Sequence, residues 1–370
     1  MVLMALDHTR GWFSEATFYP LDLDKTNVPL FVTRWITHLC APGFIFLAGT
    51  GAFLSTLRGK DTRGLSVFLV TRGLWIVLLE LTWVRCLGWS FNFDYHFIIF
   101  SVLWAIGWSL VVLGALVWLP VEWVAAIALV VIAAHNLFDY VKPADWGSAG
   151  WLWTVLHSPG ELKPAANVRI AVPYVLVPWV AVMALGYAVG ALWKRPPDER
   201  RRWLFRIGAA MTLLFIVVRF NNAYGDTHPW HSQKNAIFTV FSFIHCEKYP
   251  PSLLYVLMTL GPLLMALAWL ERGTPAALRP LLVFGRVPLF YYCLHLPLLH
   301  GLAIIVARVR FGRSDWLTTN PPAPPAPDGN GFGLPVVYLV WIAAVLVLYP
   351  LCKWFADLKA RRRDPWLSYL

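Results

Sequence analysis

The sequence predicts an all-α protein, a polytopic bundle of about nine transmembrane helices behind a truncated first helix. Three observations support this fold class. Of the 370 residues, 58% are hydrophobic and 14% are charged, whereas soluble domains average about 45–50% and about 25%. The mean hydropathy is +0.59. The 21 tryptophans and 23 phenylalanines suit aromatic belts at two membrane interfaces.

Nine apolar segments are each long enough for a tilted membrane helix, although the fourth and sixth are marginal. They cover residues 29–57, 64–87, 95–118, 120–138, 169–193, 203–221, 251–271, 281–307 and 333–355. We expect helices because backbone polar groups in lipid must be satisfied within the segment. The runs do not alternate as the strands of a membrane barrel do. Nothing marks a second domain, so residues 1–370 are expected to form one integral membrane domain.

The first residues form an apolar stub that ends in polar groups. Met1–Leu6 is too short to span a bilayer, which takes about 20 apolar residues. Asp7, His8 and Arg10 follow at once, as at a membrane surface. We therefore expect a truncated first helix with an Asp-His pair at its water end, where proton transfer can meet both phases.

Basic residues predict the orientation of the bundle. Short loops with dense Lys and Arg, above all Arg200–Arg202 and Arg361–Arg363, alternate with longer loops that carry fewer. The first set is cytoplasmic by the positive-inside rule, which also places the C-terminus inside. The same clustering explains the net charge of +11 without a nucleic-acid partner. The lipid bilayer is the expected partner, and a homo-oligomer is left open.

Several costly polar groups fall in the outer halves of the predicted spans. Charged groups in lipid usually face the bundle interior or a cavity, so we expect one polar cavity that opens outward. Two structural alternatives stay open: Glu80 pairs with Arg34 or Arg85, or the histidines only join helices. No HxxxH or HxxE pattern supports a metal site, so none is expected. The predicted set comprises Asp7, His8, Arg34, His38, Glu80, Arg85, Asp94, His96, His135, Asn136, Asp139, His295 and His300.

Six sequence blocks resemble bacterial membrane proteins related to the heparan-alpha-glucosaminide N-acetyltransferase catalytic domain. The resemblance implies a multi-helix transferase of the bacterial plasma (inner) membrane. It would take an acetyl group from cytosolic acetyl-CoA, its co-substrate, to a sugar or glycan amine or hydroxyl on the outer side. The blocks are residues 1–10, 31–50, 91–95, 104–108, 248–253 and 284–290 running on to His295.

The resemblance also implies catalytic residues. His8 stands where related membrane O-acetyltransferases carry a histidine, and Asp7 stands where the animal enzyme has an asparagine. The animal enzyme's catalytic histidine, which lies in the loop after the helix of that asparagine, has no counterpart here, because the loop Gly11–Pro29 contains no histidine. The catalytic candidates are therefore His8, Asp7 and His38, since histidine suits proton transfer near neutral pH.

The remaining candidates bind substrates. Arg34, at its depth, suits a thioester oxyanion or a substrate carboxylate, whereas the inner-face arginines Arg72 and Arg286 suit the phosphates of CoA. The acceptor and oxyanion set is Arg34, Glu80, Arg85, His295 and Lys248. Two other functions stay open. A transporter or flippase of a polar or lipid-linked glycan would use the same groups as a binding site, and a structural membrane protein would use them for assembly.

Overall fold

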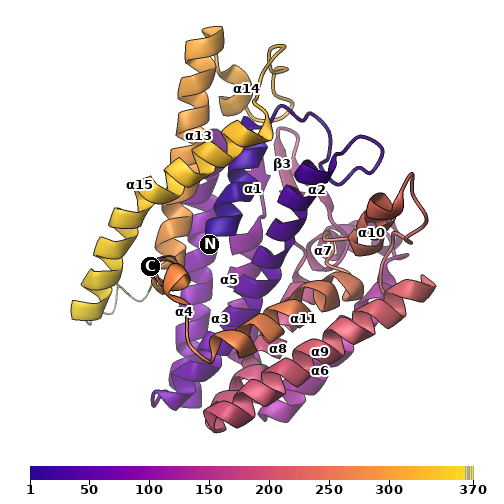
Figure 1. Ribbon diagram of the computed structural model, residues 1–370, viewed down its shortest axis with the longest axis vertical. Coiled ribbons are helices and arrows are strands. Elements are labelled where there is room, and N and C mark those ends of the chain that lie inside the picture. Colours follow the sequence, from indigo (N-terminus) through magenta and orange to yellow (C-terminus); the bar gives the residue numbers. More distant parts are fainter. Residues whose placement is uncertain (363, 365–366, 368, 370) are drawn as a thin grey trace. The chain divides into compact units, whose positions relative to one another are not determined.

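A computed structural model describes residues 1–362, 364, 367 and 369 (Figure 1). Helices dominate it, so the predicted all-α class is confirmed. The chain divides into two compact units that interleave along the sequence. The first unit comprises Met1–Cys40, Leu81–Ile98 and Thr274–Leu370, and the second comprises Ala41–Glu80 and Ile99–Gly273. The single domain expected for residues 1–370 stays a prediction.

Eight helical segments of the described chain are long and apolar enough to cross a membrane, so this is an integral membrane protein. The helix found within the expected span at 95–118 is shorter than predicted. This helix, α5 (Val102–Leu116), has 15 residues, because residues 95–100 form a turn and a short strand instead of the first turns of a helix. The eight segments are Val28–Leu57, Thr62–Ser90, Val121–Phe138, Leu176–Lys194, Pro197–Asn221, Leu253–Leu270, Pro288–Phe311 and Leu334–Arg361.

The first unit is built on three helices that pack together. α1 (Val2–Phe13) contacts both α13 (Pro288–Phe311) and α15 (Leu334–Arg361) (Figure 1). Leu6, Phe13, Ala303 and Val337 form their shared core. The other elements are α2 (Val28–Trp35), η1 (Ile36–Leu39), most of the π-helix η2 (Glu80–Ser90), η6 (Ala276–Leu281), α12 (Leu282–Arg286) and α14 (Asp315–Thr318).

Hydrogen bonds tie both ends of α1 to the C-terminal part of the chain. The indole N–H of Trp341 donates to the Val2 carbonyl at 2.8 Å. At the other end the Phe332 N–H donates to the Phe13 carbonyl at 2.7 Å. The position of this short helix is therefore set by residues more than three hundred positions away.

The second unit is a helix bundle whose helices approach closely at small residues. α4 (Thr62–Leu79) packs on α5, and α9 (Pro197–Asn221) packs on α11 (Leu253–Leu270) (Figure 1). A Cβ on Gly208 would lie 2.6 Å from the Gly261 carbonyl oxygen, so a larger residue there would push the helices apart. The other helices are α3 (Cys40–Leu57), α6 (Val121–Ala134), η3 (His135–Phe138), η4 (Pro143–Ala149), α7 (Gly150–Leu156), α8 (Leu176–Gly190), η5 (Ala191–Lys194) and α10 (Ala236–Ile244).

Loops of the second unit are ordered by specific contacts. β2 (Gly160–Ala165) and β3 (Val168–Val172) form an antiparallel hairpin, and the Phe100 N–H after β1 (Phe97–Ile99) donates to the Ala171 carbonyl at 2.8 Å. The segment after α9 is held by the buried Arg219, whose guanidinium donates to four backbone carbonyls. These belong to Phe243, His228, Ser242 and His245, at 2.7 to 3.0 Å.

Candidate functional site

Two histidines from opposite ends of the chain meet in the first unit. His8 lies on α1 and His295 on α13, and these helices pack against each other. Nδ1 of His8 lies 2.7 Å from Nε2 of His295. His295 is fully buried, whereas His8 is partly exposed. The pair thus combines a shielded histidine with a partly exposed one.

A backbone carbonyl decides how protons are placed in this dyad. Nδ1 of His295 lies 3.0 Å from the carbonyl oxygen of Tyr291. Because a carbonyl only accepts, the hydrogen of His295 belongs on Nδ1, and its Nε2 carries a lone pair. His8 Nδ1 therefore donates to His295, and in a neutral His8 the unprotonated nitrogen is Nε2. This tautomer is assigned from the hydrogen-bond network, and it suits His8 Nε2 as a base.

Aromatic rings surround the His8 imidazole. Trp89 meets it edge-on at a centroid distance of 5.5 Å, and Tyr292 does so at 6.4 Å. Trp12, one turn along α1, lies at 6.1 Å. Such rings restrict the imidazole to one orientation and lower the local polarity, which strengthens electrostatic interactions with a reacting group.

Asp7 is held between two arginines. Arg34 of α2 donates from Nη1 to Asp7 Oδ2 at 2.9 Å, and Arg10 donates from Nη2 to Oδ1 at 3.1 Å. The Arg34 side chain is 6% exposed and Asp7 is 23% exposed. The same Arg34 nitrogen also donates to Thr37 Oγ1 at 3.0 Å. The carboxylate of Asp7, which precedes His8 in sequence, thus bridges two guanidinium groups.

His38 belongs to the same unit as the dyad. It lies in the 3₁₀ segment η1, which contacts α1, and the side chain is 1% exposed. It follows Arg34 by four residues, but the helix changes to 3₁₀ geometry between them. The structure thus gives His38 a deeper position than the partly exposed His8.

Two predicted binding residues of the first unit, Arg85 and Arg286, lie in different environments. Arg85 is buried and donates to the backbone carbonyls of Asn92, Asp94 and Phe97, so it orders the segment after η2. Arg286, at the end of α12, is exposed. Their roles toward substrate and CoA stay predictions.

Three predicted binding residues belong to the second unit. Glu80 is fully buried, and its Oε1 accepts from the Ser101 hydroxyl at 2.6 Å. Lys248 is buried between Tyr174 and Tyr249, at 5.7 and 5.0 Å from their ring centroids. Arg72 lies over the Phe68 ring. The substrate and CoA roles of Glu80, Lys248 and Arg72 also stay predictions.

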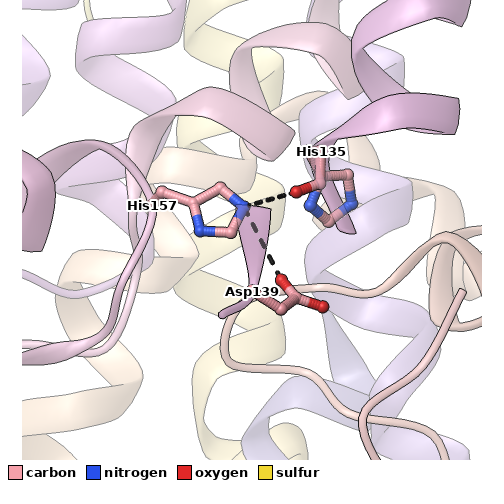
Figure 2. A group of neighbouring side chains, drawn as sticks. All are labelled: His135, Asp139 and His157. Atoms are coloured by element: carbon pink, nitrogen blue, oxygen red, sulfur yellow. Dashed lines mark hydrogen bonds and ion pairs between the residues drawn. The ribbon is translucent and has the colours of Figure 1, made fainter. Parts of the chain in front are cut away.

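A group of side chains suited to a metal ion also lies in the second unit, where the sequence predicted none. Ligand atoms of His135, Asp139 and His157 all lie within 4.8 Å of one another (Figure 2). The spacing of His135 and Asp139, four residues apart, is a metal-ligand pattern that a search for HxxxH and HxxE alone misses. His157 joins them only through the fold.

Sequence reasoning chose His8 and His295 separately but not as a pair. They are 287 residues apart, and without an alignment nothing links them. Trp12, Trp89 and Tyr292 were not singled out either, because aromatic residues are too frequent in this chain to mark a site. Two separate signals pointed toward this part of α13: the polar set of the predicted spans, which contains His295, and the family block that runs on to it.

Comparison with known proteins identifies one family. The sequence model of the family described as heparan-alpha-glucosaminide N-acetyltransferase, catalytic, matches residues 1–221. The matched range contains Asp7, His8, Arg34 and His38. The resembling blocks at 248–253 and 284–295 lie beyond it. No curated protein matches the chain.

Proposed function

The chain belongs to the heparan-alpha-glucosaminide N-acetyltransferase catalytic family, and from this premise we propose that it transfers acetyl groups from acetyl-CoA to a sugar amine or hydroxyl. The observation that carries the proposal is the His8–His295 hydrogen bond of 2.7 Å. A partly exposed base with an assigned tautomer, backed by a buried partner, is what acyl transfer to a weak nucleophile needs.

The chemistry follows from the dyad. His8 Nε2 removes the proton of the acceptor N–H or O–H as this group attacks the thioester carbonyl. The resulting imidazolium is stabilised because its Nδ1–H donates to His295 Nε2, whose own Nδ1–H is held by Tyr291. The tetrahedral intermediate collapses, the C–S bond breaks, and the proton passes from His8 to the CoA thiolate. The products are the acetylated sugar and CoA.

A fixed guanidinium in the same unit as the dyad supports the same reaction. An oxyanion forms on the thioester oxygen in the intermediate, and fixed donors that face it lower the barrier. Arg34 is our candidate donor, because its guanidinium is fixed by Asp7 and Thr37 and α2 begins at a defined Asn27 cap. Asp7 is then a positioning residue rather than the base.

We also propose the orientation that the basic loops predict, in a bacterial plasma membrane with the C-terminus in the cytoplasm. Arg72 and Arg286 would then face CoA phosphates on the inner side, and the sugar would bind outside. The alternation of basic loops requires α5 to cross despite its 15 residues. Its largely buried surface supports this, because a short helix among other helices need not span lipid by itself.

Single-cysteine labelling tests the orientation. In a variant without native cysteines, position 198 should resist a membrane-impermeant thiol reagent added from outside, while position 232 should react. Labelling of position 198 from outside would overturn the topology and the sidedness of the reaction together.

Purified protein tests the function. We expect acetyl-CoA to raise its melting temperature and radiolabelled acetyl to pass to glucosamine. Desulfo-CoA lacks the thiol and carries no acetyl, so it should stabilise the protein without supporting transfer. If glucosamine or another glycan binds but acetyl-CoA does not, the protein is a transporter or flippase of such substrates instead.

A further inference from the structure

The end of α6 carries a cluster that acetyl transfer does not use. His135 directly follows α6, Asp139 follows the 3₁₀ turn η3, and His157 follows α7. Nε2 of His157 lies 3.7 Å from Oδ1 of Asp139 and 2.9 Å from the His135 carbonyl oxygen. Figure 2 shows the three side chains converging on one small space.

Polar atoms of this cluster are buried without partners. His135 is 3% exposed, and neither of its ring nitrogens has a hydrogen-bond partner among the described residues. Asp139 Oδ1, which points toward the histidines, also has none within the described chain. Burying such groups unpaired costs about 1–3 kcal/mol each. A bound cation would satisfy the imidazole and the carboxylate oxygen at once.

We propose that His135, Asp139 and His157 form a binding site for a divalent transition-metal ion, with Zn²⁺ the best fit. Two imidazoles and one carboxylate are typical zinc ligands, and three protein ligands leave a fourth position open. In a tetrahedral site the ligand atoms lie about 3.4 Å apart, so the widest gap closes by about 1–1.5 Å. Rotation of the side chains supplies that movement.

The surroundings hold the ligands as metal sites usually do. Asn136 Nδ2 donates to Asp139 Oδ2 at 2.8 Å, which leaves Oδ1 for the ion, and the Leu253 N–H fixes Asn136 by donating to its Oδ1 at 2.9 Å. The His157 ring stacks on Trp153 at 5.0 Å. Such outer contacts orient metal ligands and contribute about 10–100-fold to affinity.

Metal binding requires one change in the protons. Nε2 of His157 now donates its hydrogen to the His135 carbonyl. To bind the ion, the ring shifts its proton to Nδ1 and turns the Nε2 lone pair from the carbonyl toward the metal. Without metal, the same contact makes a hydrogen-bonded cluster. The experiment must distinguish this cluster from a metal site.

Zinc titration of tag-free, chelator-treated protein tests the proposal. We expect one Zn²⁺ per chain by elemental analysis and a rise in melting temperature on zinc addition. Asp139→Asn keeps the shape but loses the charge, and His157→Gln loses a ligand, so each should weaken zinc binding about 100-fold or more. His228→Gln is the matched control, because this exposed histidine of the same unit lies outside the cluster, and it should bind zinc as the wild type does.

Cobalt substitution in the wild type keeps the test independent of variant folding. Co²⁺ bound by the cluster should give the intense visible absorption of a four-coordinate site, and Zn²⁺ should displace it. If that band is absent and zinc does not change the melting temperature, the cluster is only hydrogen-bonded. Wild-type zinc affinity in both Asp139→Asn and His157→Gln would also overturn the assignment.

Discussion

The two histidine clusters differ in which ring nitrogen meets a backbone carbonyl. In the first unit, Nδ1 of His295 donates a hydrogen bond to the Tyr291 carbonyl, and its Nε2 faces His8. In the second unit, Nε2 of His157 donates a hydrogen bond to the His135 carbonyl, and the carboxylate of Asp139 lies near the same nitrogen. The first arrangement leaves the Nε2 lone pair of His8 suited to proton transfer. The second places the carboxylate of Asp139 beside the imidazole, which favours a bound cation. The same residue type is thus committed to different chemistry by its neighbours.

Removal of His8 should have the largest effect. His8→Ala takes away the base of the dyad, which typically contributes about 10²–10⁴-fold. Turnover in the glucosamine assay should fall by that factor, while acetyl-CoA still raises the melting temperature.

His38→Ala is the control for this loss. His38 is buried in η1 of the same unit, and it should retain most of the activity. If His38→Ala abolishes transfer while His8→Ala keeps it, the base is His38 and the dyad is structural.

Changes at His295 should be graded. His295→Ala removes the acceptor for His8 Nδ1–H and should lower turnover about 10²-fold, with little change in KM for acetyl-CoA. His295→Gln keeps an acceptor oxygen near that position and should recover about tenfold of the loss. The pH–rate profile should shift in the alanine variant and return toward the wild type in the glutamine variant. Equal rates and profiles in both variants would mean that His295 only fills space.

The two aspartates should respond oppositely to the same substitution. Asp7→Asn breaks the contacts with Arg10 and the buried Arg34, and should destabilise the protein by about 2 kcal/mol, because a buried charge loses its partner. Burial raises the pKa of Asp139, so Asp139→Asn should leave the melting temperature of metal-free protein unchanged or higher. Thermal scans of both variants without metal compare them, and a matching loss in both would contradict the contrast.

The smallest expected effect is on stability and comes from a third histidine, His245. Burial, together with nearby His228, lowers the pKa of His245 to about 4. The unfolded chain protonates this histidine below about pH 6.5, but the folded chain does not until about pH 4. The histidine therefore costs stability as pH falls through that window, on the order of 1 kcal/mol at pH 5 for this partly exposed group.

His245→Asn removes this pH dependence. Relative to wild type, the variant should gain melting temperature as pH falls from 7 to 5. Glu247, whose pKa is raised mainly by burial, contributes with the opposite sign in both proteins and cancels in the comparison. A difference between the two proteins that stays constant from pH 7 to 5 would show that His245 does not titrate as the structure implies.

Hydropathy predicted the fold class well, because length and apolarity alone decide whether a helix can cross lipid. It misplaced the start of the helix within 95–118, since the apolar strand at 97–99 has the same hydropathy as a helix and merges with it in a long apolar window. The division into two interleaved units was not predictable, because it rests on contacts between distant segments. The site shows the same limit: His8 was found by its local context and its family, whereas its pairing with His295 depends on how α1 and α13 pack.

The hydrogen bond between Trp341 and the Val2 carbonyl has a consequence for biogenesis. α1 is synthesised before α13 and α15, yet it acquires these partners only when both have been synthesised and inserted. The proposed base is therefore synthesised 287 residues before its histidine partner. A nascent chain that stops before α13 cannot assemble the dyad, so activity would arise only in chains that extend at least through α13.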